Sequence, residues 1–432
     1  MTDGYIHPIS ASELEPWQTV YSPEGALAAL GRLDERSYAA VRAALVSCGH
    51  GEKVSIAEDN ILNDALTLSP EGRDMIYDGP LRLSQSKIDS YNSCPLAYFC
   101  KYDLSLLPEE RAEFDARNIG SFIHAILENF FGEVVRDGIQ LDTLDTKATE
   151  AMVHRGAKRY LDELCDGGGM TRREELLLGR LCRTAMPVVT GLCDEFRGSQ
   201  FVPRFFELKI KRGSEAGPEP IEFKSSDGER IFIGGSIDRV DTFTDGDDVY
   251  VRVVDYKTGK KEFSPSDIDK GQNLQMFLYL KAIVDTKNRK FLDELGVKEG
   301  GAPIPAGVVY VKTEIGDVRI DTPVREIAEK AVADAQTRNG MILGEDADIA
   351  ASNAKYLPIR LKTDGTPYST SADKVYTREG WDELCLKLKG VVESIADRMK
   401  SGDVSAKPLI EKGRKSPCEY CEFRPICRNP KI

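Results

Sequence analysis

Two short apolar runs, each followed by an aspartate, constrain the fold of this chain more than any other feature. Residues 231–237 are Ile-Phe-Ile-Gly-Gly-Ser-Ile and precede Asp238, whereas residues 249–254 are Val-Tyr-Val-Arg-Val-Val and precede Asp255. The polar cluster Asp-Gly-Asp-Asp between them is typical of a turn that joins two antiparallel strands. The sequence therefore predicts a β-hairpin that brings the two carboxylates to one edge of a sheet.

The second aspartate is part of an Asp-x-Lys pattern that suits phosphodiester hydrolysis. Asp255 and Lys257 are two residues apart, so both side chains point to the same face of a strand. Two carboxylates can hold a hard cation such as Mg²⁺, and a neighbouring lysine can orient or deprotonate water. The same spacing is also typical of an exposed ion pair, so the pattern alone leaves both interpretations open.

Composition limits how such a site could obtain its substrate. The chain has 432 residues, of which 41% are hydrophobic, enough for one large domain with appendages. Its net charge of −13 does not favour binding of a polyanion by bulk attraction. We therefore expect either a local concentration of basic residues or a partner that delivers the nucleic acid. Basic residues near the hairpin are Lys209, Lys211, Arg212, Lys257, Lys260 and Lys261.

The sequence contains no apolar run of membrane-spanning length and no signal-peptide pattern. We therefore expect a cytoplasmic protein without membrane association. In a reducing compartment its ten cysteines are expected to be thiols or metal ligands and not disulfides.

The pattern of elements predicts an α/β fold with a central mixed sheet flanked by helices. Strand signals concentrate between residues 202 and 256, and amphipathic helices are expected at 119–131 and 377–400. Residues 1–80 have helical signals without a chemical motif. They are predicted to form a helical N-terminal appendage, and residues 81–432 the main domain.

Three closely spaced cysteines near the C-terminus predict a metal site. Cys418 and Cys421 form Cys-x-x-Cys, and Cys427 follows after five residues. Zinc and an iron–sulfur cluster would both accept these thiolates, with a fourth ligand from elsewhere in the chain. The best fourth candidate is Cys94, and Cys100 is its rival. A ligand set drawn from both ends of the domain would hold it closed, which is a structural role.

Two helical pairs could add to a site. His124 shares a helix face with Glu128, and Gln275 shares one with Tyr279, in each case four residues apart. The histidine could bind a metal, and the amide and phenol could contact a phosphate. Taken alone, each pair is more typical of ordinary helix packing.

The order of these motifs resembles the RecB-type branch of the PD-(D/E)XK nucleases, and within it the C-terminal nuclease domain of the AddB type. The resemblance covers residues 81–432 and rests on the identity, order and approximate spacing of the motifs. They are Tyr-x-x-Cys-Pro at 91–95, Gly-Ser-Phe-Ile-His at 120–124, a strand glutamate, Gly-Ser-Ile-Asp-Arg-Val-Asp at 235–241, Val-Asp-Tyr-Lys-Thr-Gly at 254–259, Leu-Gln-x-x-x-Tyr at 274–279, and the C-terminal cysteines.

This resemblance implies roles for the residues that match the family pattern. Mg²⁺ or Mn²⁺ is expected on His124, Asp238 and Asp255. Lys257 is expected to position the attacking water, and Glu207 to support the site.

The resemblance also implies roles outside the metal site. Gln275 and Tyr279 are expected near the DNA backbone. A 4Fe–4S cluster, which the resemblance favours over zinc, is expected to join the C-terminal segment 410–432 to the start of the domain. Its implied ligands are Cys94, Cys418, Cys421 and Cys427.

The implied function is that of a Mg²⁺-dependent DNA exonuclease acting on single strands. It would be the nuclease part of an AddAB-type helicase–nuclease in double-strand break repair and recombination, with an AddA-like helicase as its partner. The chain contains no G-x-x-x-x-G-K-[ST] phosphate loop, so we do not expect it to hydrolyse ATP by itself. Residues 1–80 could then be the remnant of a helicase-like region. Two alternatives remain: a stand-alone CRISPR-adaptation-type iron–sulfur exonuclease, and a non-catalytic DNA-binding scaffold.

Overall fold

The chain forms two compact units in the computed structural model. The structure describes residues 20–30, 33–62, 66–106, 116–141, 143–164, 172–257, 264–313, 338–344, 352, 354–410 and 416–427. Unit 1 comprises Met1–Asp78, Ser90–Pro108 and Arg398–Ile432, and unit 2 comprises Gly79–Asp89 and Glu109–Asp397. The predicted division into an N-terminal appendage, residues 1–80, and a main domain, residues 81–432, stays a prediction.

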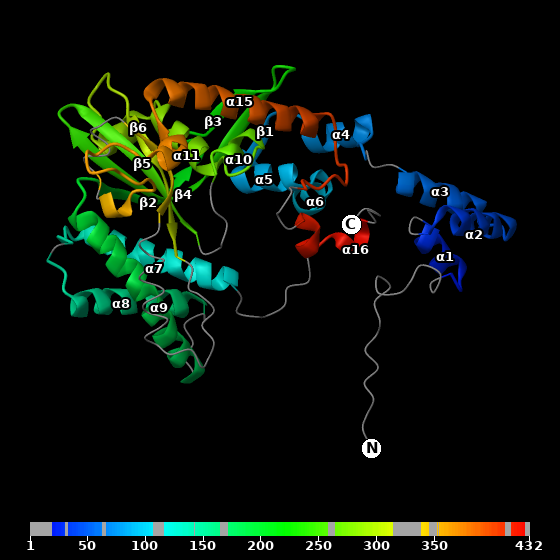
Figure 1. The fold of residues 1–432 in the computed structure, drawn as a ribbon, viewed down its shortest axis with the longest axis horizontal. Coiled ribbons are helices and arrows are strands. Elements are labelled where there is room, and N and C mark those ends of the chain that lie inside the picture. Colours follow the sequence, from blue (N-terminus) through cyan, green and yellow to red (C-terminus); the bar gives the residue numbers. More distant parts are fainter. Residues whose placement is uncertain are drawn as a thin grey trace. The chain divides into compact units, whose positions relative to one another are not determined.

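All strands that the structure describes belong to one mixed sheet in unit 2 (Figure 1). They are β1 (Leu81–Ser84), β2 (Val202–Ile210), β3 (Ile221–Lys224), β4 (Arg230–Asp245), β5 (Asp248–Lys257), β6 (Ile304–Lys312), β7 (Arg338–Leu343) and β8 (Val375–Tyr376). The order is β1-β4-β5-β6-β7-β8, and β2 and β3 also pair with β4. The pairs β1–β4, β5–β6 and β7–β8 are parallel and the others antiparallel, which confirms the predicted mixed sheet.

The predicted hairpin is formed by β4 and β5. The two strands are antiparallel and are joined at Asp245 and Asp248, the ends of the polar turn cluster. Most of β5 is buried, because helices cover both faces of the sheet there. A strand buried on both faces needs a continuous apolar run and not an alternating one, which explains the Val-rich sequence before Asp255.

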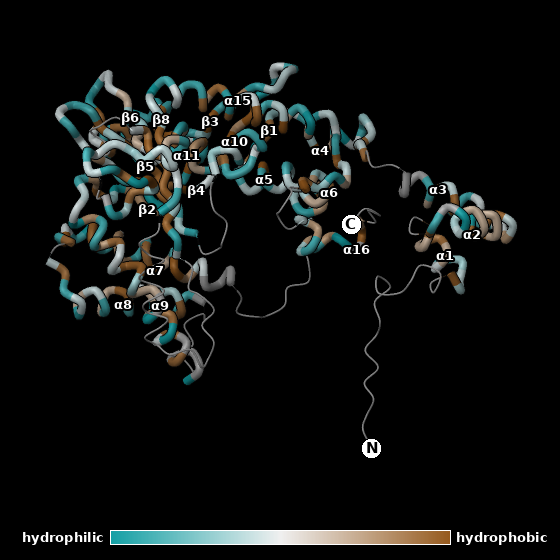
Figure 2. Tube along the Cα trace, in the orientation of Figure 1, coloured by the Kyte–Doolittle hydropathy of each residue, from teal (hydrophilic) through white to brown (hydrophobic). Residues whose placement is uncertain are grey.

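Helices flank both faces of the sheet, as predicted. α7 (Ala116–Arg136), α8 (Thr146–Leu164) and α9 (Arg172–Arg197) share one apolar core with Val309 and Val311 of β6. Phe277 of α11 (Gln275–Val284) faces the alternate residue Val308, on the other side of the sheet. Hydrophobic segments of the chain accordingly occur both in the strands and in the helices that flank them (Figure 2).

The remaining helical elements of unit 2 are short. They are α10 (Ser266–Asp269), α12 (Arg289–Leu295), η4 (Ala354–Tyr356) and η5 (Ser369–Lys374). Two further helices, α5 (Gln85–Ser93) and α15 (Arg378–Lys400), contain residues of both units. Among the residues that the structure describes, no helix combines the length and hydrophobicity that crossing a bilayer requires.

Unit 1 is helical. Its elements are α1 (Pro23–Ala29), α2 (Glu35–Ser47), α3 (Gly51–Leu62), α4 (Pro70–Tyr77), α6 (Pro95–Tyr98), η3 (Phe99–Asp103), η6 (Pro417–Tyr420) and α16 (Arg424–Cys427). The C-terminal segment returns alongside the region of α5 and α6. The backbone N–H of Leu409 donates to the carbonyl of Ser93 at 2.8 Å, and that of Leu96 donates to the carbonyl of Ser405 at 3.1 Å.

Residues 83–95 have near their start a serine that could cap a helix and end in Cys-Pro, a pattern that predicts one continuous helix up to the proline, and the structure differs from it. β1 occupies the first residues, and α5 begins only after Ser84, whose hydroxyl lies 3.4 Å from the backbone nitrogen of Lys87. Cys94 is extended, and Pro95 begins α6 where a helix stop was expected. Proline suits the first turn of a helix because the amide hydrogen that it lacks has no helical partner there.

Candidate active site

β4 and β5 part where the predicted site residues begin. The last residues paired between them are Arg239 and Val254. Beyond this point β4 continues beside β2, and β5 continues beside β6. We call this opening the fork. Asp238 and Asp255 are the first residues beyond the last pair, one on each arm, so the hairpin brings them to the same opening as predicted.

A histidine and two carboxylates converge at the fork. His124 Nδ1 lies 3.5 Å from Asp238 Oδ2 and 3.9 Å from Glu207 Oε1. One possible ligand atom from each residue lies within 4.8 Å of the other two. We call these three residues the His–Glu–Asp cluster. Nitrogen and oxygen donors at this spacing can surround a single divalent cation.

The backbone of Tyr256 holds two members of this cluster in place. His124 Nε2 lies 3.0 Å from the Tyr256 carbonyl, to which it can donate, leaving Nδ1 directed at the carboxylates. The Tyr256 N–H in turn donates to Asp238 Oδ2 at 2.8 Å. This side-chain bond occurs where the β4–β5 ladder has ended, and it ties the two arms of the fork together.

Glu207 reaches the cluster from a strained position on β2. Its φ of 47° lies in the left-handed region, which non-glycine residues rarely adopt. The Ser236 hydroxyl donates to Glu207 Oε2 at 3.0 Å, and Lys209 Nζ lies 3.6 Å from the same oxygen. Strain of this kind is retained where the surroundings fix it and is frequent at functional sites.

The titration of the cluster reflects crowded negative charge. Burial, reinforced by Asp255, raises the pKa of Asp238 to about 7. Burial lowers the pKa of His124, but the Glu207 hydrogen bond and the Asp238 charge outweigh it and raise the value to about 9. The same hydrogen bond lowers the pKa of Glu207. A cation bound here would relieve the repulsion between the carboxylates.

Asp255 and Lys257 occupy the other arm of the fork. Asp255 is 4% exposed, and Lys257 Nζ lies 2.8 Å from its Oδ2. The ammonium group is also 5.9 Å from the centre of the Tyr310 ring on β6. The Lys257 side chain is 41% exposed, so it joins the buried carboxylate to solvent. Asp255 is not in the His–Glu–Asp cluster, since the 4.8 Å limit does not include it.

The predicted Gln275 and Tyr279 lie on α11 beside β4. Tyr279 is buried, and its hydroxyl is hydrogen-bonded to the Gln275 side chain and the Ser236 backbone. A Cβ atom at Gly235 would collide with that hydroxyl, so glycine permits the close approach of helix and strand. Tyr279 thus contacts the strand segment just before Asp238. Its predicted place near the DNA backbone, and that of Gln275, stay predictions.

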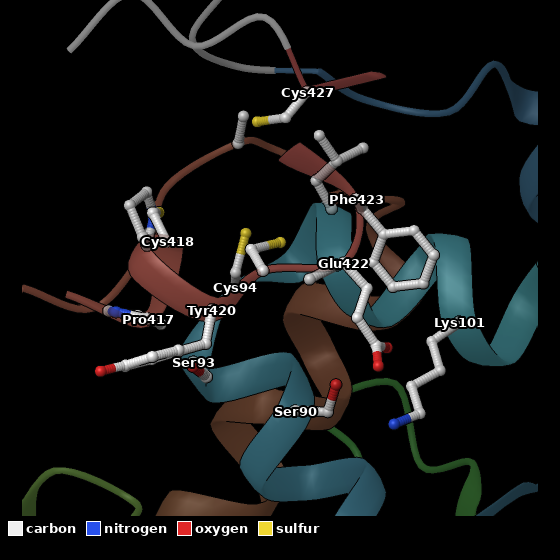
Figure 3. A pocket seen from close by; sticks show the side chains of 15 residues that line it. Ser90, Ser93, Cys94, Lys101, Pro417, Cys418, Tyr420, Glu422, Phe423 and Cys427 are labelled. Carbon is white, nitrogen blue, oxygen red and sulfur yellow. The ribbon is translucent and has the colours of Figure 1, made fainter. Parts of the chain in front are cut away.

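In unit 1, the four predicted cluster ligands border one cavity of ≈ 190 Å³ (Figure 3). They are Cys94, Cys418, Cys421 and Cys427. The rival Cys100 is buried and is not among the lining residues. Burial raises the pKa of Cys94 to about 11, and Cys427 and Cys418 add to this effect. Such a thiol ionises near neutral pH only if a metal takes the place of its proton. This donor set therefore fits a metal or an iron–sulfur group.

Comparison with known proteins decides the family. Residues 82–428 match the model of the PD-(D/E)XK nuclease superfamily. The chain belongs to the PD-(D/E)XK nuclease superfamily. Membership confirms the resemblance and the predicted class of enzyme, a metal-dependent nuclease, and it agrees with the α/β fold.

Curated relatives of this PD-(D/E)XK chain are each named as a subunit of an ATP-dependent helicase/deoxyribonuclease, the AddB type of the resemblance. Those of Alkaliphilus oremlandii and Alkaliphilus metalliredigens are each 30% identical to it, over 370 and 364 residues. That of Clostridium botulinum strain Hall is 28% identical over 362 residues. Each match covers 82% of this chain and 30% of the relative, so the chain spans under a third of the length of these relatives.

PD-(D/E)XK nucleases use divalent metals, and the residues at the fork fit one. The His–Glu–Asp cluster offers one nitrogen and two oxygen donors, and Asp255 adds a buried carboxylate on the opposite arm. This set adds Glu207 to the expected ligands His124, Asp238 and Asp255, and it is Glu207 and not Asp255 that meets the 4.8 Å limit with His124 and Asp238. No pattern of residue types around Glu207 predicts the positive φ at this position.

A buried ion network behind the fork was missed by the sequence analysis. Arg239 donates to the Tyr256 hydroxyl at 2.9 Å and to Asp241 at 3.1 Å, and Arg252 donates to Asp241 at 2.9 Å. Arg239 and Asp241 are both 0% exposed. The alternation in Ile-Asp-Arg-Val-Asp is a signal that could have found it, because it puts Arg239 and Asp241 on the face opposite Asp238.

Proposed function

We propose that this chain hydrolyses DNA phosphodiesters with Mg²⁺ or Mn²⁺, as an exonuclease that prefers single strands. The observation that carries the proposal is the convergence of the His–Glu–Asp cluster with the Asp255–Lys257 pair at one fork. Family membership supports the hydrolytic chemistry, and the printed names of the relatives support DNA as the substrate. The same names favour this function over a CRISPR-adaptation-type nuclease and over a scaffold without activity.

The proposed division of labour follows from the positions of the side chains. His124, Asp238 and Asp255, with Glu207 as an additional donor, would hold the cation. A bound Mg²⁺ would supply Lewis acidity at the phosphate and activate water.

Lys257 would act on the water and on the transition state. Its ammonium group is held by Asp255 at 2.8 Å and reaches solvent, so it can orient a water at the edge of the cation site. A fixed positive charge beside the phosphate also stabilises the negative charge that develops during hydrolysis. Asp255 therefore has two partners in this proposal, the cation and the lysine.

The cysteine cavity would hold a 4Fe–4S cluster with a structural role. One of its four thiols lies between α5 and α6, and three come from the last residues of the described chain. Ser405 and Leu409, which precede these residues, are already joined to the α5–α6 region by backbone hydrogen bonds. Ligation would strengthen this connection within unit 1.

We further propose that the chain acts with an AddA-like helicase in the cytoplasm, in double-strand break repair. The relatives' printed name includes a helicase activity, and the net charge of −13 disfavours capture of DNA by bulk attraction. A motor that feeds single strands to the fork would compensate for this charge.

The test is cleavage of end-labelled single-stranded and duplex oligonucleotides by the full chain in Mg²⁺, beside an Asp255→Ala variant. Products released one nucleotide at a time from single strands by the parent, and none by the variant, are expected. Equal cleavage by both proteins would contradict the site assignment. DNA binding by the parent without cleavage would favour the scaffold.

A further inference from the structure

Each arm of the fork has a lysine two residues after a carboxylate: Lys209 follows Glu207 on β2, and Lys257 follows Asp255 on β5. On the β2–β4 arm, Lys209 is paired with Ser236. On the β5–β6 arm, Lys257 is paired with Lys312. Paired residues on adjacent strands are about 4.8 Å apart and share a face of the sheet. The acidic residues of the fork are thus followed by a row of basic ones. We call Lys209, Lys257 and Lys312 the lysine row.

The contacts of the row place positive charge at the cation site. Lys209 Nζ lies 2.9 Å from Ser236 Oγ and 3.6 Å from Glu207 Oε2, while its side chain is 58% exposed. Lys257 contacts Asp255 in the same way on the opposite arm. Each of these lysines therefore touches a carboxylate of the site with one edge of its ammonium group and faces solvent with the rest.

The pairing of Lys257 with Lys312 concentrates positive charge at two adjacent strand ends. Lys312 is half-buried at the end of β6. Because the two lysines share a face of the sheet, one anionic group can lie across both strand ends and accept from both ammonium groups. A phosphodiester chain provides such a group at every nucleotide.

We propose that Lys209 and Lys312 bind the phosphates on the two sides of the scissile phosphate, so that the DNA strand crosses the fork from β2 to β6. This inference rests on the proposed function and adds to it the path of the substrate. The scissile phosphate lies at the carboxylates, with Lys257 between the two flanking lysines. Because the net charge of −13 disfavours bulk attraction of a polyanion, this local row of positive charge is proposed to hold the strand on the chain.

Salt dependence of DNA binding tests the row. Lys209→Gln and Lys312→Gln are compared with the parent in Ca²⁺, by anisotropy of a labelled single-stranded oligonucleotide. Each lost phosphate contact is expected to reduce the slope of log K against log salt by about 0.7. Lys290→Gln is the matched control, because Lys290 is 60% exposed and 3.4 Å from Glu215, much as Lys209 is placed beside Glu207.

Unchanged slopes in both variants would overturn the proposal. If Lys209 has only a structural role, Lys209→Gln will bind Mn²⁺ more weakly because Glu207 is no longer held in place, and its salt slope will equal that of the parent. That result would also overturn the proposal. A parent chain that neither binds nor cleaves DNA would overturn the proposed function and this inference together. A parent that does both, with variants equal to it, would overturn this inference alone.

Substrates with one neutral methylphosphonate linkage give the direction of the strand. Neutralising a phosphate that a lysine binds weakens binding to the parent but not to the variant that already lacks that lysine. Lys209→Gln is expected to lose its sensitivity at a phosphate on one side of the cleavage point, and Lys312→Gln on the other. Loss of sensitivity at the same phosphate in both variants, or at none, would contradict the proposed path.

Discussion

His124 Nδ1 lies 3.5 Å from Asp238 Oδ2, although one residue belongs to a helix and the other to a strand that is distant in the sequence. The Tyr256 backbone connects them, since its carbonyl faces His124 Nε2 and its N–H donates to Asp238. The end of β5 therefore sets the geometry of the cation site. This is why the site lies where the hairpin opens and not along its paired length.

Protons and metal compete for the same atoms at this site. His124, with a pKa raised to about 9, and Asp238, with a pKa raised to about 7, must lose their protons before they bind a cation. Mn²⁺ affinity is therefore expected to rise with pH, by up to about tenfold per pH unit between these two values. Titration calorimetry of the parent and of His124→Gln measures it. The variant should lose the dependence above neutral pH, and equal pH profiles would contradict the assignment.

The φ of 47° at Glu207 predicts that two variants that both lose metal affinity differ from each other in stability. Both Glu207→Gly and Glu207→Ala remove a carboxylate, so both should bind Mn²⁺ more weakly than the parent. Glycine adopts positive φ freely whereas alanine does not, so the glycine variant should be more stable than the alanine variant by about 1 kcal/mol. Urea unfolding without metal measures the difference. An alanine variant at least as stable as the glycine variant would show that the backbone there is unstrained.

The buried network gives a prediction about the fold. Asp241 accepts hydrogen bonds from two arginines and is 0% exposed, so Asp241→Asn leaves buried charge unpaired. The free energy of unfolding is expected to fall by about 3–5 kcal/mol. Asp247→Asn is the control, because its ion pair with Lys298 is exposed and should contribute at most about 1 kcal/mol. Similar losses in both variants would contradict a stabilising network.

The cysteine cavity predicts a coupling between colour and stability. Anaerobically purified chain should be brown, and Cys421→Ser should lose the colour and melt at a lower temperature, because metal binding contributes to folding. Cys48→Ser changes an exposed thiol far along the sequence from these ligands and should retain both properties. Loss of colour with unchanged melting would contradict the structural role of the cluster.

Much of the fold could be predicted from local sequence. The β4–β5 hairpin follows from two apolar runs around a polar turn, and α7 and α11 follow from helical periodicity. The pairing of β1 with β4 could not be predicted, because it joins a four-residue strand to a partner far along the chain. No local pattern determines such a non-local parallel pair.

The same division applies to the site. Asp238 and Asp255 follow two apolar runs whose strands and turn could be predicted, and the C-terminal cysteines indicated a metal site by their spacing, whereas His124 was favoured as a ligand only through family resemblance. The closeness of Glu207 depends on one backbone angle, and the lysine row depends on the register of four strands. Lys260 and Lys261, noted in the sequence, lie outside the described residues.

Lys257 provides the most direct measurement for the central claim, that the fork is a hydrolytic site. In Lys257→Gln, Mn²⁺ affinity should stay within about twofold of the parent, because the lysine is not a ligand, while single-turnover DNA cleavage in Mg²⁺ should slow by about 100-fold or more. Both quantities are measured on the full chain at one pH. Cleavage at the parental rate by a variant that binds metal normally would contradict the account.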